Sequence, residues 1–306
     1  MKAILVGNGT MGERHRGRFE LCGVNFVAVA DTQAEFDGIV DKLNLRNARE
    51  MSASETSAGV DFAVIASPAT THYRYTKYFL ERHIPVFVEK PLATTAEQAQ
   101  ELVDMAAASG TVLFVAQSEC FNPIFLNFRK HFVAELNARI ASNEGRAGVR
   151  LDFRREHRYS SRCRDVNVML DLLVHDLSMF LTMFRAEDVK MEWLKTGKKA
   201  SNDEAEFDSA MMRLRVASGE YRGVIADFYV NRKSNCDMRE IAVEFPKSRY
   251  TVSLAHYNSE GEVEHVPDSL DNEHRFFLKL LAGACTDWGR RAAQNAADCV
   301  RMCGGV

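Results

Sequence analysis

The sequence predicts two domains of different class. The first is an α/β domain with a doubly wound parallel sheet over 1–118, and the second is an α+β domain with an open, mostly antiparallel sheet over 119–306. Uniformly apolar runs alternate with helical segments as far as Ala116, whereas apolar and polar residues alternate within the strand-like segments after Pro123. A chain of 306 residues is long enough to build both hydrophobic cores.

The strands of the first domain are short apolar runs, as is typical of parallel strands that are buried on both faces. They are expected at 3–6, 26–30, 62–66, 85–88 and 112–115. Apolar residues at helical spacing place helices between them at 72–82 and 95–108. This alternation predicts the doubly wound sheet.

The first strand runs directly into a Gly-x-Gly-x-x-Gly motif. Gly7 allows the tight turn, Gly9 lets a pyrophosphate approach the backbone, and Gly12 lets the following helix pack closely on the strand. The N-terminus of that helix offers unpaired N–H groups to phosphate oxygens. The motif therefore predicts a Rossmann dinucleotide site formed by Gly7, Gly9, Thr10, Met11 and Gly12.

The second strand ends at Asp31, nineteen residues past Gly12, where a Rossmann acidic residue receives the ribose hydroxyls. A carboxylate at this position repels a 2′-phosphate, and Thr32-Gln33 supply no arginine to bind one. We therefore expect NAD rather than NADP as the cofactor. The alternative is that Asp31 only caps the next helix.

The second domain is predicted from strands that are apolar on one side only, at 149–153, 210–214, 223–230, 240–245 and 250–254. A helix is expected at 124–136 and a strongly apolar helix at 168–184. A final helical region covers 273–302, and its packing against the first domain is left open. We expect the exposed face of the open sheet to be covered by another subunit.

The composition excludes several functional classes. The net charge of −3 indicates no nucleic-acid partner, and no apolar run is long enough to span a membrane. The N-terminus lacks the pattern of a signal peptide. The seven cysteines include no Cys-x-x-Cys pair, which predicts reduced thiols in a cytoplasmic protein, without a disulfide framework or a metal site.

Several motifs follow one another in an order that resembles a known family. They are the glycine motif, Ser67-Pro68 with His72, Glu89-Lys90-Pro91, Gln117 with Phe121-Asn122-Pro123, and Asp171-x-x-x-His175. Together they resemble the Gfo/Idh/MocA family of nicotinamide-dependent sugar and polyol oxidoreductases, over nearly the whole chain. The resemblance implies hydride transfer between NAD(P) and a secondary alcohol or ketone of a sugar, sugar nucleotide or polyol.

Lys90 stands at the carboxyl end of a buried parallel strand, which is where open α/β sheets bind their ligands. A lysine there can donate to a substrate hydroxyl or stabilise an alkoxide as hydride leaves. The resemblance implies that Lys90 contacts cofactor and substrate as a catalytic residue, with an unusual Lys-Pro geometry at Pro91. Without the resemblance, a solvated lysine at a strand end would be the first interpretation.

Asp171 and His175 lie four residues apart on an apolar helix, so they project from the same face. Histidine is suited to accept a hydroxyl proton near neutral pH, and a carboxylate can orient it or bind a second hydroxyl. The resemblance assigns catalysis to His175 and substrate contact to Asp171. A helix pair and half of a metal site are the alternatives, but Asp176 points about 100° away and supplies no third ligand.

Supporting residues follow the strands of the first domain. Ser67, Pro68, His72, Glu89 and Gln117 are predicted to contact the cofactor, and Asn122 is predicted to contact the substrate. For His72 a packing role is the alternative. For Gln117 and Asn122 the alternative is hydrogen bonding that holds the crossover loop.

Arginines crowd the approach to the apolar helix, at positions 154, 155, 158, 162 and 164. Guanidinium groups bind phosphate and carboxylate through two nitrogens, so this cluster could hold a substrate anion. We take Arg158 and Arg162 as the substrate-binding candidates. A solvated strand edge or a subunit contact is the alternative, and the same pair of interpretations applies to Asn231-Arg232-Lys233.

The form Val168-Met-Leu-Asp-Leu-Leu-Val-His-Asp176 resembles the branch that includes dehydrogenases of UDP-amino sugars. An inositol- or dihydrodiol-type dehydrogenase is one rival, and a non-catalytic, dinucleotide-sensing regulator on the same fold is another. The resemblance also implies homodimers or homotetramers that pair through the second-domain sheet.

Overall fold

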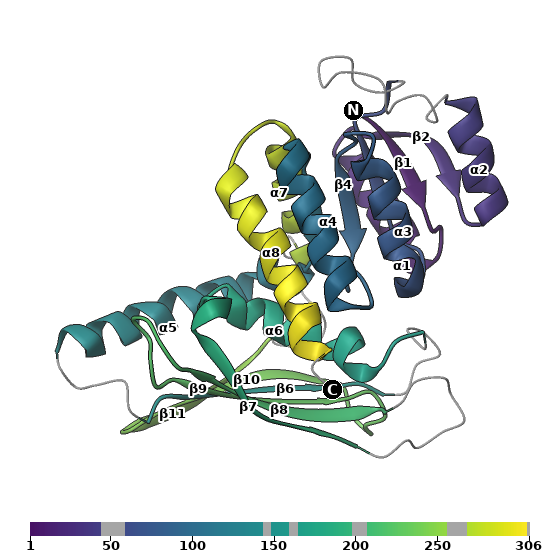
Figure 1. The fold of residues 1–306 in the computed structure, drawn as a ribbon. Coiled ribbons are helices and arrows are strands. Elements are labelled where there is room, and N and C mark those ends of the chain that lie inside the picture. The colour runs from purple at the N-terminus through teal and green to yellow at the C-terminus, as the bar shows by residue number, and fades with distance from the viewer. Residues whose placement is uncertain (44–58, 143–147, 159–164, 198–206, 256–267, 305–306) are drawn as a thin grey trace. The chain divides into compact units, whose positions relative to one another are not determined.

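The structure is a computed structural model that describes residues 1–43, 59–142, 148–158, 165–197, 207–255 and 268–304. The chain forms two compact units. The first comprises Met1–Gln117 and Leu270–Gly305, and the second comprises Ser118–Ser269 (Figure 1). No helix within the described ranges combines the length and the apolar character that crossing a membrane requires.

In the described part of the first unit, five strands form a parallel sheet in the order β2-β1-β3-β4-β5. The strands are β1 (Lys2–Val6), β2 (Asn25–Ala30), β3 (Phe62–Ile65), β4 (Val86–Glu89) and β5 (Leu113–Ala116). All residues of β3, β4 and β5 are buried, as continuous apolar runs predict. The predicted parallel sheet is confirmed.

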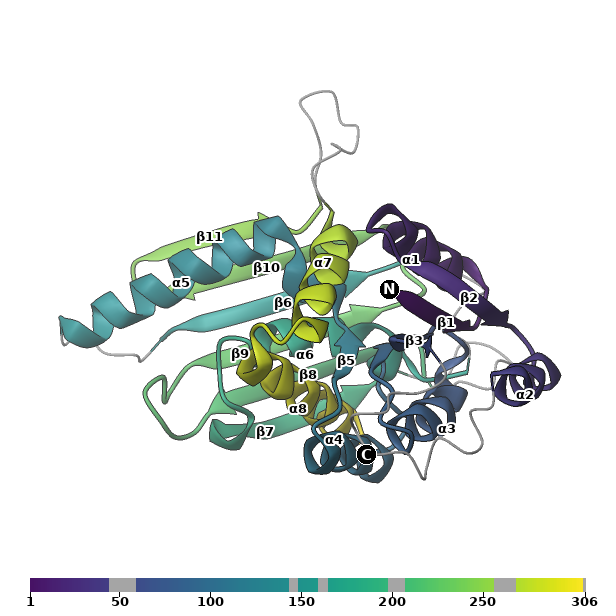
Figure 2. The same cartoon turned by 90° about the horizontal axis from the view of Figure 1, so that it is seen from above.

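Helices cover both faces of this sheet (Figure 2). Phe19 of one helix and Phe277 of another both contact the ring of Phe87 on β4, so these two helices share a face. On the other face, Phe36 packs against Phe79. The helices are α1 (Thr10–Leu21), α2 (Gln33–Lys42), α3 (Ala69–Leu80), α4 (Ala96–Ser109), α7 (Ser269–Leu281) and α8 (Thr286–Cys303).

The last two helices, α7 and α8, belong to the first unit although they follow the second unit in sequence. Helix α8 lies against α4 and β5, and its Ala293, Ala296 and Val300 are buried. The sequence predicts one helical region over 273–302, but the structure contains two helices there. The break falls where Gly283 and Cys285 adopt left-handed backbone conformations, with φ of 84° and 57°.

In the described part of the second unit, a six-stranded sheet has the order β11-β10-β6-β9-β8-β7. Among the described strands of this sheet only the β6–β9 pair is parallel, so the predicted open, mostly antiparallel sheet is confirmed. The strands are β6 (Arg150–Glu156), β7 (Val189–Thr196), β8 (Ser209–Val216), β9 (Ile225–Asn231), β10 (Met238–Phe245) and β11 (Ser248–Ser253). Strand β7 was not predicted.

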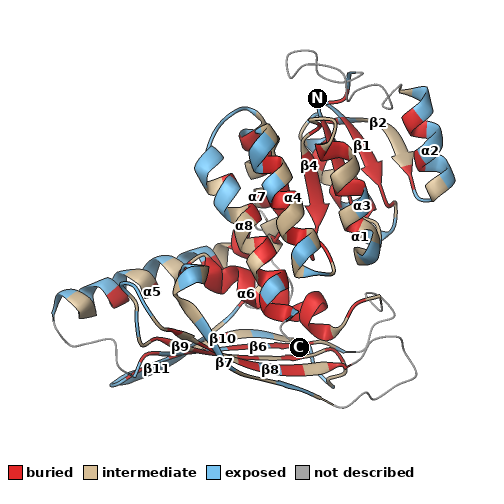
Figure 3. Cartoon of the chain, in the orientation of Figure 1, coloured by how far each residue is buried: buried red, intermediate tan, exposed pale blue. Residues whose placement is uncertain are grey.

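One face of this sheet carries α5 (Pro123–Ala141) and α6 (Val174–Leu181) (Figure 1). Buried residues alternate with exposed or half-buried ones along β6, β8 and β9 (Figure 3). Phe153 and Phe228 stack on the buried face, with ring centroids 4.9 Å apart. Short helical turns complete the second unit at η3 (Ser118–Phe121), η4 (Met169–Leu173) and η5 (Ala186–Asp188).

Candidate functional site

The glycine loop of the first unit has the geometry that its sequence predicts. Gly7 has a φ of 93°, and a Cβ there would lie 2.3 Å from the backbone nitrogen of Ser67. A Cβ on Gly12 would lie 1.9 Å from the carbonyl oxygen of Gly7. A Cβ on Gly9 would meet no protein atom within 4 Å, and Thr10 beside it is exposed. The loop is therefore close-packed at two glycines and open at the middle one, as a pyrophosphate cradle requires.

Asp31 reaches this loop from the end of β2. Its Oδ1 accepts a hydrogen bond from the backbone N–H of Asn8 (2.7 Å). Helix α2 is capped by Thr32, whose side chain accepts from the backbone of Glu35 while the Glu35 carboxylate accepts from Thr32. The hydrogen bonds from Asp31 and Thr32 hold the pKa of Glu35 below its usual value. Asp31 is thus not the cap of the next helix, and its exposed carboxylate stands beside the loop.

His72 connects the ends of two neighbouring strands. Its side chain is buried, and its two ring nitrogens contact the carbonyl oxygens of Pro91 (2.7 Å) and Ser67 (2.8 Å). Ser67 and Thr71 also bond through their hydroxyls (2.7 Å). These contacts favour the packing role of His72 that the sequence left open, with Ser67 and Pro68 leading into α3.

Lys90 follows the last residue of β4 at the carboxyl edge of the sheet, where it is half-buried. The peptide bond between Lys90 and Pro91 is cis. The carboxylate of Glu89 accepts a hydrogen bond from the backbone N–H of Lys90 (3.1 Å) and contacts Nε2 of His15 (2.7 Å). Glu89 is buried, as is Gln117, which follows the neighbouring strand β5.

In the second unit, Asp171 lies in a π-helical turn, Met169–Leu173, that leads into α6. The sequence predicted a continuous α-helix over 168–184, and the wider turn is a correction to it. Asp171 is buried, with its Oδ2 3.7 Å from Nη1 of Arg232, while His175 is half-buried. Single π-helical turns inside helices are frequent at functional sites, so the turn supports the predicted functional role of Asp171.

Arg232 anchors this turn from the end of β9. Its Nε donates to Asp208 (3.0 Å), and its Nη1 donates to the carbonyl oxygen of Val166 (2.9 Å) at the approach to the turn. Lys233 pairs with Asp208 as well (2.8 Å). Arg232 therefore holds the segment that carries Asp171, while Lys233 is engaged with Asp208.

The comparison with known families concerns the first unit. Residues 1–117 match the Gfo/Idh/MocA model, which is described as an oxidoreductase family with an NAD-binding Rossmann fold. This domain belongs to the Gfo/Idh/MocA oxidoreductases. The cofactor class that the glycine motif predicted is confirmed, and the chain carries the NAD-binding domain of an oxidoreductase.

Relatives extend the similarity beyond this Gfo/Idh/MocA domain. The chain is 25% identical over 253 residues to the UDP-N-acetylglucosamine 3-dehydrogenase of Acidithiobacillus ferrooxidans, with 81% of this chain and 73% of that protein aligned. It is 29% identical over 223 residues to the inositol 2-dehydrogenase of Acidothermus cellulolyticus, with 70% of this chain and 62% of that protein aligned.

A solved structure shares the fold of both units. GenD2 from gentamicin A biosynthesis, in complex with NAD, superposes with a TM-score of 0.72 at 18% identity. The superposition covers 99% of this chain and 92% of that one. The second unit is therefore part of the shared fold, beyond the residues that match the Gfo/Idh/MocA model.

The arginine cluster is largely occupied by internal partners. Arg155 is buried and pairs with Asp176 (2.8 Å) and with Glu119 (2.9 Å). Arg154 pairs with Glu156 (2.6 Å). Arg155 is therefore not available for the anion clamp that the sequence suggested, because its guanidinium serves these two carboxylates.

The two substrate-binding candidates of that cluster differ in what the structure says of them. Arg158 is exposed, and its Nε donates to the carbonyl oxygen of Asn235 (3.2 Å). Arg162 and Arg164 lie outside the described residues. Arg158 is thus an exposed arginine two residues past the end of β6.

Asn122 forms the N-cap of α5. Its Oδ1 accepts from the backbone N–H of Ile124 (2.9 Å), and its Nδ2 donates to Glu119 (3.2 Å) and to the carbonyl oxygen of Leu254 (3.0 Å). The side chain is buried. These bonds favour the structural role that the sequence left open for Asn122 over contact with substrate.

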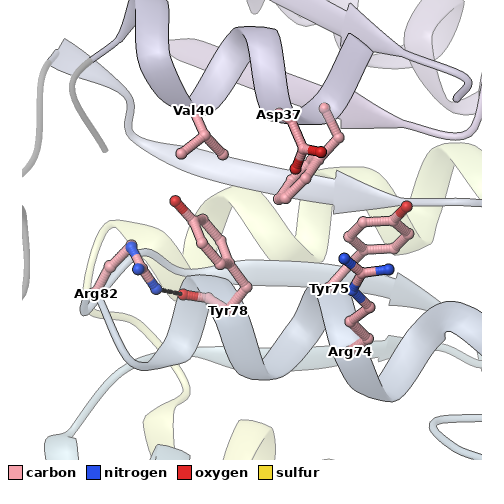
Figure 4. A pocket seen from close by; sticks show the side chains of 7 residues that line it. Asp37, Val40, Arg74, Tyr75, Tyr78 and Arg82 are labelled. Carbon is pink, nitrogen blue, oxygen red and sulfur yellow. Dashed lines mark hydrogen bonds between the residues drawn. The ribbon is translucent and has the colours of Figure 1, made fainter. Parts of the chain in front are cut away.

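Two cavities of the first unit lie apart from the predicted site residues. One, of about 170 Å³, is lined by side chains of α2 and α3, where Arg82 stacks on Tyr78 and donates to its carbonyl oxygen (Figure 4). The other, of about 260 Å³, lies between α4 and α8. Neither is lined by a predicted cofactor or catalytic residue. In the described ranges, no three His, Cys, Asp or Glu side chains form a group that could hold a metal ion.

His15 and His274 were not predicted as site residues, yet they contact one another at 2.9 Å in the interior of the first unit. His15 lies one turn past the glycine motif, and this position beside the motif was the available signal. Nothing in the local sequence of His274 indicates its role, because its partner is 259 residues away.

Proposed function

We propose that the protein is an NAD-dependent dehydrogenase or reductase that transfers hydride between nicotinamide and a CH–OH carbon of a sugar-like substrate. The observation that carries the proposal is the position of Lys90. It is half-buried at the carboxyl end of β4, in an NAD-binding Rossmann domain, directly after a buried carboxylate. Ligands of open parallel sheets bind at this edge.

Each proposed catalytic residue has a separate role in the reaction. When bound, NAD supplies the hydride acceptor. His175 accepts the proton of the substrate hydroxyl, and the Lys90 ammonium stabilises the negative charge that develops on that oxygen. Asp171 orients the imidazole or binds a second hydroxyl, held in place by the segment that Arg232 anchors. The reaction requires Lys90 and His175 to reach the same substrate molecule.

NAD is the proposed cofactor in preference to NADP. The support is Asp31, whose carboxylate is exposed at the end of β2 and hydrogen-bonds to the glycine loop. A negative charge in this place attracts ribose hydroxyls and repels a 2′-phosphate. The contacts of Gly7, Gly9, Thr10, Met11 and Gly12 with the pyrophosphate belong to the same proposal.

The proposed substrate is a sugar nucleotide, with a neutral polyol such as inositol as the second candidate. The similarity to a UDP-N-acetylglucosamine dehydrogenase supports the first, and the similarity to inositol dehydrogenases supports the second. Arg158 is the described side chain best placed to bind a substrate anion, because it is exposed at the end of β6.

A homodimer or homotetramer that pairs through the second-unit sheet, in the cytoplasm, completes the proposal. Its support is the sheet face opposite α5 and α6. On this face Met211 is 44% exposed, and Arg213 on β8 forms an ion pair with Asp227 on β9 (Nε to Oδ1, 2.6 Å). Cross-strand alternation places these side chains away from the core.

The test is a screen of UDP-sugars, free sugars and polyols with NAD and NADP, followed by the absorbance of the reduced cofactor. We expect reduction of NAD by at least one of these alcohols. Lys90→Ala and His175→Ala should each lower kcat by about 10²-fold or more, with NAD binding nearly unchanged. Wild-type turnover in both variants would refute the assignment, and no hydride transfer to or from any substrate would favour a dinucleotide-sensing regulator.

A further inference from the structure

A chain of three side chains lies behind Lys90 in the interior of the first unit. Glu89 at the end of β4 contacts His15 of α1, with Oε1 and Nε2 2.7 Å apart. His15 in turn contacts His274 of α7, with Nδ1 and Nε2 2.9 Å apart. Nδ1 of His274 bonds to the carbonyl oxygen of Leu270. His15 and His274 are fully buried, and Glu89 is 9% exposed.

The hydrogen-bond partners limit where the protons lie. A carbonyl oxygen only accepts, so His274 donates through Nδ1 to Leu270. One further proton lies between Nε2 of His274 and Nδ1 of His15. The other nitrogen of His15, Nε2, faces a carboxylate oxygen of Glu89, which also accepts when it is ionised.

Glu89 is the ionised member of the chain. Burial alone would raise the pKa of Glu89, but the hydrogen bond from His15 and the nearby charges of His15, Lys90 and His72 hold that pKa below its usual value. With Glu89 as carboxylate, His15 donates to it through Nε2. This buried hydrogen bond to a charged acceptor is strong, so its geometry changes only at a high cost.

The second carboxylate oxygen of Glu89 connects this pair to Lys90. Oε2 accepts a hydrogen bond from the backbone N–H of Lys90 (3.1 Å), while Oε1 is held by His15. Both oxygens of one carboxylate are then fixed, one by the interior and one by the backbone of the proposed catalytic residue. A rigid carboxylate therefore restrains where the Lys90 backbone lies.

Aromatic packing fixes His274 in turn. Its ring stacks on Phe87 of β4, with centroids 5.2 Å apart, and meets the edge of Phe19 at 4.2 Å. His15 also contacts the ring of Phe87. The three side chains are thus packed between the sheet, α1 and α7, and have little freedom to rotate.

We infer that His15 and His274 are positioning residues that act through Glu89 to hold Lys90 in its productive place. The inference rests on the proposed role of Lys90 in hydride transfer. It makes the C-terminal helix α7 a contributor to the site, although α7 follows the motifs of the first unit by more than 150 residues.

His274 is the position at which to test the inference, because His15 shares its helix with the glycine loop. His274→Phe keeps a ring against Phe87 but removes the hydrogen-bond partner of His15. His274→Gln places an amide near the position of Nε2 and restores a hydrogen-bond partner. Phe277→Leu is the matched control, because Phe277 packs on Phe87 from the same helix without a hydrogen bond to the chain.

We expect His274→Phe to lower kcat by about tenfold or more, with the KM for NAD within about twofold of wild type, because a small misplacement of a reacting group costs rate. His274→Gln should recover most of that loss, and Phe277→Leu should lower Tm while leaving kcat near wild type. Equal kcat values in His274→Phe and Phe277→Leu would overturn the inference, as would no recovery in His274→Gln.

Two further measurements separate this inference from the proposed function. Wild-type turnover in Lys90→Ala would refute the role of Lys90 itself, whereas an inactive Lys90→Ala beside a fully active His274→Phe would refute only the positioning role. Independently of activity, ¹⁵N NMR of the histidine rings should show a proton on Nε2 of His15 and on Nδ1 of His274. An unprotonated nitrogen at either place would contradict the chain.

Discussion

The guanidinium of Arg155 donates to the carboxylate of Asp176 through two nitrogens, with Nε 3.1 Å and Nη2 2.8 Å from Oδ1. Its third nitrogen, Nη1, donates to Glu119 (2.9 Å). This contact joins β6, α6 and the η3 turn inside the second unit. An arginine that the sequence suggested as a substrate clamp is therefore a buried structural centre.

Arg155→Met should strongly destabilise the second unit. Two buried carboxylates would lose their partner, which typically costs about 3–5 kcal/mol of unfolding free energy. Arg154→Met is the control, because Arg154 is 54% exposed and Glu156 keeps its hydrogen bond from Ser234, so the loss of Arg154 should cost less than the loss of Arg155. Urea denaturation of both variants measures the difference, and equal midpoints would contradict the structural role of Arg155.

Glu119 should make the stability of the second unit depend on acid pH. Burial would raise the pKa of Glu119, but the charges of Arg155 and Arg239 outweigh it and hold that pKa below the usual value of about 4.5. A lowered folded-state pKa gives stability that is present above the unfolded pKa and is lost as pH falls below it. The Tm should therefore fall steeply below about pH 4.5. Glu119→Gln should have a lower Tm at neutral pH and a shallower decline, and an unchanged slope would exclude Glu119 as the cause.

The two glycines of the loop should respond differently to alanine. Gly9→Ala meets no protein atom within 4 Å, so Tm should stay near wild type while NAD binding weakens by about tenfold or more, because the methyl group occupies the pyrophosphate approach. Gly12→Ala places its Cβ 1.9 Å from the Gly7 carbonyl oxygen and should lower Tm as well. Calorimetric titration with NAD and a thermal melt distinguish them. Undiminished NAD binding in Gly9→Ala would place the pyrophosphate elsewhere.

Asp31→Asn should weaken the preference for NAD. The amide oxygen can still accept from the backbone N–H of Asn8, so the glycine loop stays in place while the charge that repels a 2′-phosphate disappears. We expect the ratio of kcat/KM for NAD to that for NADP to fall by about tenfold or more. Asp37→Asn is the control, because Asp37 is exposed on α2, the helix that follows Asp31. A constant ratio in Asp31→Asn would mean that another group discriminates between the cofactors.

The parts of the fold that follow from periodicity were predictable. Burial can be predicted directly from the residue pattern in two groups of strands. These are the continuous apolar runs of β3, β4 and β5 and the strands with one apolar side, β6, β8 and β9. Strand β7 was missed although Val189, Met191 and Trp193 alternate with polar residues. It lies at the sheet edge with no fully buried residue, and Leu194 and a register shift between Met191 and Trp193 break the pattern. The π-helical turn was missed because Leu172 and Leu173 suit either kind of helix.

The candidate site was predictable where its chemistry is local in sequence. The glycine motif and Lys90 stand at strand ends, which a pattern can locate. The partners that hold them are not local: His274 is 259 residues from His15, and Asp176 is 21 residues from Arg155. A single sequence does not state such pairs, because each member alone resembles an ordinary helix or strand residue.

The return of α7 to the first unit has a consequence for biosynthesis. Phe277 fills the face of a sheet whose strands all lie within the first 117 residues. A nascent chain therefore carries Phe62 and Phe87 without this cover until the ribosome has translated the entire second unit. A chain stalled or cut before residue 270 should expose that apolar face to chaperones and aggregation, however well its own strands have paired.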